Sequence, residues 1–104
     1  MSNIFKDPWV RVGPYADNLL KELLRELGPG HPLWGRGLRA VAQRTDSDDV
    51  LFEVSGVEPL YAVVHLTWSG KPESDPNFPD VKTFASMDHW IREGMMQDHA
   101  EFMS

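Results

Sequence analysis

The sequence contains no cysteine among its 104 residues. This excludes disulfides, a catalytic thiolate and zinc sites that use cysteine. Small secreted domains often depend on disulfides, so their absence favours a reducing compartment. No apolar run reaches membrane-spanning length, and the N-terminal "MSNIFKDPWV" lacks the apolar centre of a signal peptide. We therefore expect a cytoplasmic protein without a membrane partner.

Basic residues are also scarce, with ten Lys and Arg against sixteen Asp and Glu and a formal net charge of −6. Binding to nucleic acid requires clustered positive charge. The only concentration of arginines is formed by Arg36, Arg39 and Arg44, which we interpret as solvent-facing strand residues. The sequence thus predicts no nucleic-acid partner, and its acidity favours a basic protein partner through electrostatic steering.

Common catalytic and cofactor motifs are missing as well. The sequence has no Gly-x-Ser-x-Gly, His-Glu-x-x-His or phosphate-binding Gly-x-x-x-x-Gly-Lys motif, so we expect no cofactor. His89 and Glu93 are four residues apart on a predicted helix, and Asp98 or His99 would have to supply a third metal ligand. We interpret His89 and Glu93 as an ordinary surface pair and expect no metal.

The pattern of apolar residues predicts one α+β domain over 15–104, preceded by an irregular arm over 1–14. A helix is expected where leucines recur at helical spacing and polar residues cover the opposite face, up to Gly28 and Pro29. The leucines are Leu19, Leu20, Leu23, Leu24 and Leu27, and the polar residues are Asp17, Lys21, Glu22, Arg25 and Glu26.

The middle of the chain predicts an antiparallel β-meander of three to four strands. Strands are expected over 38–45, 50–56 and 61–68, with a short edge strand at 81–84. A second amphipathic helix follows Ser86, a good N-cap, and packs on one face of the sheet. The tail 99–104 is expected to fray.

The run "YAVVHLTW" at 61–68 places His65 among apolar residues. We interpret His65 as a structural strand residue that satisfies its polarity with one hydrogen bond. Catalysis would need a second polar group directed at His65. The candidates near it are Asp48, Asp49 and Glu53, and the turn predicted at "DSDD" should keep such groups hydrated.

Residues 48–91 resemble a family of small uncharacterised bacterial proteins. The shared pattern is "DDVLFE", then "VVHLTWSGK", a proline-containing loop and a Ser-x-x-x-Trp helix, and it extends back to "HPLWGRGLRAVAQRT". The resemblance covers about two-thirds of the chain by this count. It implies a bacterial, cytoplasmic, compact domain, and it transfers no activity and no catalytic residue.

Two hypotheses for function remain. The first is a non-enzymatic interaction domain, for example an immunity or antitoxin protein, that binds a basic protein partner. Spare aromatic residues and a proline-stiffened acidic loop favour it. The predicted contact residues are Trp34, Trp68, Glu73, Asp75, Phe78 and Asp80.

The second hypothesis is a small hydrolase or metal-dependent enzyme that uses His65 with Asp48, Asp49 or Glu53. It requires these side chains to converge in a cleft. A homodimer formed through the sheet or through an exposed tryptophan is compatible with either hypothesis.

Overall fold

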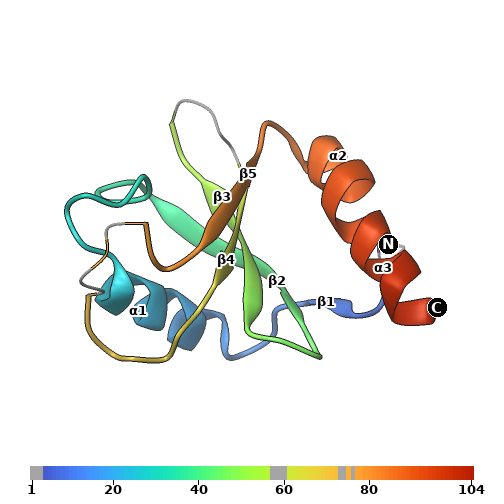
Figure 1. Ribbon diagram of the computed structural model, residues 1–104, viewed down its shortest axis with the longest axis horizontal. Helices are drawn as coiled ribbons and strands as arrows, with labels where there is room; N and C mark the ends of the chain where they lie inside the picture. Colours follow the sequence, from blue (N-terminus) through green and yellow to red (C-terminus); the bar gives the residue numbers. More distant parts are fainter. Residues whose placement is uncertain (1–3, 57–60, 73–74, 76) are drawn as a thin grey trace.

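A computed structural model describes residues 4–56, 61–72, 75 and 77–104 of the chain. Five strands form one antiparallel sheet in the order β1-β2-β3-β4-β5 (Figure 1). The elements are β1 (Trp9–Arg11), α1 (Ala16–Glu26), β2 (Leu38–Arg44), β3 (Asp49–Val54), β4 (Tyr61–His65), β5 (Val81–Phe84), α2 (Met87–Trp90), η1 (Ile91–Met95) and α3 (Met96–Met103). The predicted α+β class is confirmed, but the sheet has five strands and not three to four.

The additional strand is β1, which lies in the segment predicted as an irregular arm. Trp9 pairs with Arg44 of β2 in antiparallel register and is only 1% exposed. Its indole packs edge-on against Trp90, with 5.2 Å between ring centroids. Three residues are too few to show a period of two in the sequence, so the strand is formed by long-range pairing and burial rather than by local pattern.

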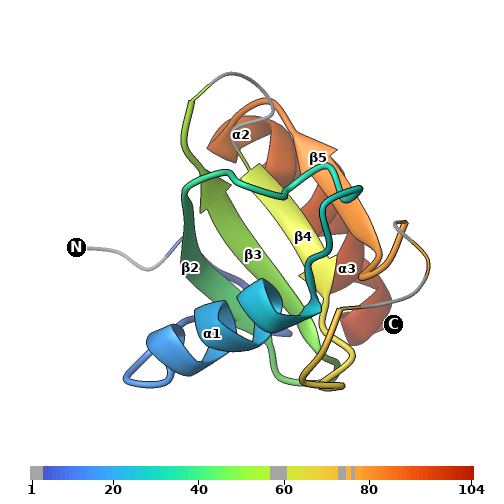
Figure 2. The ribbon, with the colours of Figure 1, turned by 90° about the vertical axis from the view of Figure 1, so that its left-hand side faces the viewer.

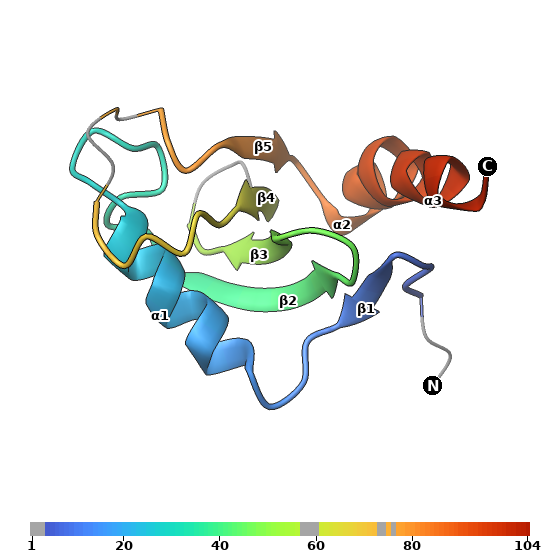
Figure 3. The ribbon, with the colours of Figure 1, turned by 60° about the horizontal axis from the view of Figure 1, so that its bottom comes forward.

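Helices cover both faces of the sheet. Figure 2 shows α1 in front of the strands and the C-terminal helical segments behind them, and Figure 3 shows the same layers from another side. Each face buries its own apolar cluster. The first comprises Leu19, Leu23, Leu27, Leu33, Ala40, Val50, Phe52, Val54, Ala62, Val64 and Leu66. The second comprises Phe5, Trp9, Ala42, Leu51, Phe84, Trp90 and Met95.

These clusters show that successive residues of β3 and β4 face opposite sides of the sheet. Val50 and Val64 face α1, whereas Leu51 and Val63 face the C-terminal helices. A central strand with a helix over each face has no polar side, which explains the continuous apolar run in β4.

Helix α1 carries the predicted leucine stripe, but its polar face is only partly exposed. Leu19 and Leu23 are buried, while Leu24 is 53% exposed. Glu22 and Glu26 were expected to face solvent, and this is wrong, because both carboxylates are buried. Residues 66–70 cross this side of the helix and donate backbone N–H groups to them. A buried carboxylate needs such donors, and sequence periodicity does not reveal them.

Strand β2 contains a bulge that decides where Arg44 lies. Ala40 is opposite Phe52, but Ala42 is opposite Leu51, so the register shifts between them. In a regular strand Ala40, Ala42 and Arg44 would share one face. The bulge moves Ala42 and Arg44 to the side of the C-terminal helices. Arg44 is therefore not the solvent-facing residue that the sequence suggested, since its side chain is 17% exposed.

The C-terminal helical segments begin as predicted, with the Ser86 hydroxyl accepting a hydrogen bond from the His89 N–H at 3.0 Å. Residues 91–95 form a π-helical turn, and helix then continues to Met103, so the predicted fraying from 99 is wrong. A Cβ added to Gly94 would lie 2.8 Å from Trp90 Cδ1, which shows how closely the indole approaches this turn. Within the described ranges, no helix combines the length and apolarity needed to cross a membrane.

Candidate functional site

The register of β3 and β4 brings an acid and an imidazole together. Asp49 and His65 are directly opposite each other in the ladder, and His65 Nδ1 lies 2.8 Å from Asp49 Oδ1. Asp49 was predicted to belong to a turn, but it begins β3 and its side chain is 25% exposed. A carboxylate accepts from Nδ1–H, which leaves Nε2 of the neutral ring as an acceptor. This single hydrogen bond matches the structural interpretation of His65 and also satisfies the geometric requirement of the enzyme hypothesis.

Arg44 links this pair to the C-terminal helix. Its Nε and Nη2 each donate to Asp46 at 2.8 Å, and its Nη1 lies 3.4 Å from Asp98 Oδ1 and 4.0 Å from Asp49 Oδ2. The hydrogen bonds to Asp46 raise the pKa of Arg44, although burial opposes the rise. The same contact lowers the pKa of Asp46. One guanidinium thus bridges three carboxylates from three parts of the fold.

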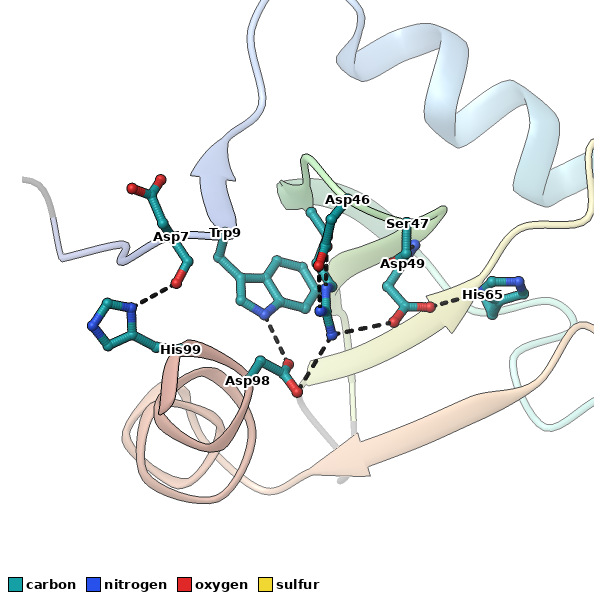
Figure 4. Close-up of polar contacts among 9 residues, drawn as sticks. Asp7, Trp9, Asp46, Ser47, Asp49, His65, Asp98 and His99 are labelled. Atoms are coloured by element: carbon teal, nitrogen blue, oxygen red, sulfur yellow. Dashed lines mark hydrogen bonds and ion pairs between the residues drawn. The ribbon is translucent and has the colours of Figure 1, made fainter. Parts of the chain in front are cut away.

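Asp98 also holds β1. Trp9 Nε1 donates to Asp98 Oδ2 at 2.9 Å, and the next residue of α3, His99, donates from Nδ1 to the carbonyl of Asp7 at 2.6 Å. Figure 4 shows these contacts on either side of the first strand. The network that begins at His65 therefore ends on the N-terminal segment, and it fixes the relative position of β1, β2, β3 and α3.

A cleft of about 590 Å³ lies beside this network, between strands β3 to β5 and the C-terminal helical segments. Its floor includes the apolar side chains of Val63, Phe84 and Trp90. Its charged lining consists of five carboxylates, from Asp49, Asp80, Glu93, Asp98 and Glu101, and two cations, Arg44 and Lys82, together with His65. The cleft shows that several polar side chains gather in one place.

The other two carboxylates proposed for His65 lie elsewhere. Glu53 is at the opposite end of β3, where its carboxylate binds Arg39 at 3.1 Å and accepts from the Tyr61 hydroxyl at 3.5 Å. Asp48 is exposed in the turn before β3, and its backbone carbonyl accepts from Leu66 N–H. Only Asp49, of the three candidates, is bonded to His65.

The predicted partner-binding residues that the structure describes are exposed, and Asp80 is the one among them that lines the cleft. Trp34, Trp68 and Phe78 are each about half exposed, as an interface anchor would be, and Asp75 is exposed. Asp80 is also exposed and lines the cleft. The remaining one, Glu73, lies outside the described residues.

Three of the residues considered for a metal site, His89, Asp98 and His99, make other contacts. His89 Nδ1 accepts from Ala85 N–H at 3.1 Å, and its ring lies edge-on to Phe84. Asp98 and His99 are used in the contacts to β1 given above. In the described part of the chain, no three His, Cys, Asp or Glu side chains are arranged to hold a metal ion.

Comparison with protein-family models, with curated proteins and with solved structures finds no match to this chain.

Proposed function

We propose that this chain is a non-enzymatic interaction domain that binds a basic protein through the cleft beside α3. The observation that carries the proposal is the excess of carboxylates in that cleft, five against two cations. Arg44 already lies between Asp98 and Asp49. The side chains of Asp80, Glu93 and Glu101 form no hydrogen bond or ion pair with another side chain in the described ranges.

Three such carboxylates around an apolar floor suit a lysine or arginine side chain of a partner. The aliphatic stem would lie on Val63 and Phe84, and the charged end would meet the acidic rim. Complementary charge of this kind chiefly increases the association rate and the specificity of a complex. An immunity protein that blocks a basic toxin would use a surface of this type.

The proposal predicts that cleft carboxylates matter more than net charge for binding. In NMR titrations with a capped hexa-arginine peptide, amide shifts should concentrate around Lys82, Glu93 and Gln97. The double variant Glu93→Gln/Glu101→Gln should bind at least tenfold more weakly, a loss of about 1.4 kcal/mol.

The matched control is Asp17→Asn/Asp88→Asn, which removes the same charge at exposed positions that do not line the cleft. This control should weaken binding less than twofold. Equal weakening by the two double variants, or shifts that avoid the cleft, would contradict the proposal. A capped hexa-glutamate peptide should produce no shifts in the cleft.

The 2.8 Å contact between His65 and Asp49 favours a second candidate, general-base catalysis in the same cleft. An imidazole oriented by a carboxylate can activate a water molecule. No serine, threonine or cysteine is among the residues that line the cleft in the described part of the chain, so water would be the nucleophile.

This candidate predicts hydrolysis of an activated ester that depends on His65. Turnover of p-nitrophenyl acetate should exceed that of free imidazole at equal concentration and fall at least a hundredfold in His65→Ala, within the range for loss of a general base. His89→Ala, in which the imidazole outside the cleft is removed, should keep the activity. If wild-type protein and His65→Ala hydrolyse the ester equally, the second candidate is excluded.

A further inference from the structure

Two glutamates on α1 are buried against each other and against a loop. The side chain of Glu22 is 3% exposed and the residue Glu26 is 0% exposed, and because they are four residues apart on α1 their carboxyl groups lie on the same side of the helix. Two ionised carboxylates repel each other, so a hydrogen bond between them requires a proton on one. The pair lies away from the cleft and plays no part in the proposed function.

The pair accepts three backbone N–H groups from the segment that follows β4. Glu26 accepts from Thr67 at 2.9 Å and from Trp68 at 2.8 Å, and Glu22 accepts from Gly70 at 3.1 Å. Trp68 has a φ of 58°, a left-handed conformation that is costly for a residue with a bulky side chain. The contacts to Glu26 therefore help to hold a strained backbone in place.

We propose that Glu22 and Glu26 share one proton and act as a pH-sensitive clamp on residues 67–70. When the shared proton is lost, two negative charges remain in a site that excludes water. Opening of the segment from α1 then becomes more favourable, because it lets water reach both carboxylates. Trp68, which is half exposed and lines a groove with Tyr15, Lys21 and Arg25, is the side chain whose position would change.

The charged groups around Glu22 and Glu26 do not neutralise the second negative charge that appears when the shared proton is lost. Arg25 Nη1 is 3.6 Å from Glu22 Oε1, and this side chain is 59% exposed. The side chains of β2 and β4 that face α1 are neutral or apolar, and Thr67 offers its hydroxyl. His31, in the loop after α1, uses one ring nitrogen toward the Pro79 carbonyl and the other to accept from Leu33 N–H.

The direction in which pH changes the stability of the closed segment follows from which carboxyl group holds the shared proton. Burial, and then the hydrogen bond to Glu22, raise the pKa of Glu26 to about 7, whereas the bond to Glu26 lowers the pKa of Glu22. A carboxyl whose pKa is raised in the closed state stabilises that state fully below its ordinary pKa of 4.5. The stabilisation is lost as the pH rises through the interval up to about 7.

Native-state hydrogen exchange tests the clamp directly. After correction for intrinsic rates, the protection factors of the Thr67, Trp68 and Gly70 amides should fall about tenfold per pH unit between pH 5 and 7 and then level off, since one proton is coupled to opening. In Glu26→Gln, whose amide can donate to Glu22 and accept from the loop, protection should be independent of pH over this range. Glu93→Gln, a change at the cleft, should behave as wild type.

Carboxyl ¹³C titration of the wild-type protein provides a second measurement that does not depend on folding of a variant. The Glu26 resonance should titrate near neutral pH. A Glu26 midpoint near 4.5 would overturn the proposal. So would protection at all three amides that does not change between pH 5 and 7 in wild type.

Discussion

Replacing Trp90 with alanine is expected to lower the free energy of unfolding by about 4 kcal/mol. Trp90 is fully buried, and it packs against Trp9, against Phe5 at 6.0 Å between centroids, and under Gly94. It is the largest side chain that joins the C-terminal helical segments to the sheet, so its removal opens a cavity and frees those segments. Urea denaturation should show a lower midpoint.

Trp34→Ala is the matched control, because it removes the same side chain from a position that is 51% exposed. It should change the free energy of unfolding by no more than about 0.5 kcal/mol. The indole Nε1 of Trp90 is buried and has no hydrogen-bond partner in the described structure, so the cost of Trp90→Ala comes from packing alone. A loss below about 1 kcal/mol would show that the helical segments are not held by this side chain.

Arg44→Ala is the second substitution with a large expected effect, about 3 kcal/mol of destabilisation. It removes the cation from between Asp46, Asp49 and Asp98, and the partly buried carboxylates of Asp49 and Asp98 would then lack the charge that lies between them. Arg92→Ala, which breaks an exposed pair with Asp88, should cost about 0.5 kcal/mol or less. Equal effects of the two substitutions in urea denaturation would contradict the role given to Arg44.

The pH dependence of the destabilisation by Arg44→Ala distinguishes the loss of a charge from the loss of packing. Arg44 lowers the pKa of Asp46, so the stability gained from that contact is present above the ordinary value of 3.8 and disappears as the pH falls below it. The difference between wild type and Arg44→Ala should therefore shrink between pH 5 and pH 2.5. A difference that stays constant over this interval would indicate packing alone.

Much of the fold could be predicted from local pattern. The leucine spacing indicated α1, runs of apolar and β-branched residues indicated β3 and β4, and Ser86 marked the start of the second helical region. These features depend on residues within a few positions of each other, so the sequence alone displays them. The segment that forms β1 was predicted to be an irregular arm. The strand is stabilised by the contact of Trp9 with Trp90, and these residues lie far apart in the sequence, so local pattern does not reveal it.

The site was less accessible to sequence reasoning. Strict alternation along β2 would place Arg44 on the same face as Ala40. The bulge places Arg44 on the opposite face, and no residue type in the strand indicates that a bulge is present. The connection between β3 and β4 leaves the register open, so Asp49 and Asp48 were equivalent candidates for His65 until the ladder was known. Glu22 and Glu26 matched a solvated helix face, and only the path of residues 66–70 shows otherwise.

The π-helical turn at 91–95 has a consequence for the phase of the C-terminal helical region. In a regular α-helix Trp90 and Asp98, eight residues apart, would differ by about 80° around the axis. One additional residue in a wide turn reduces the difference to about 20°, so both side chains reach Trp9. A chain shortened by one residue here would also bring the two side chains to within about 20° of each other, on an unbroken α-helix.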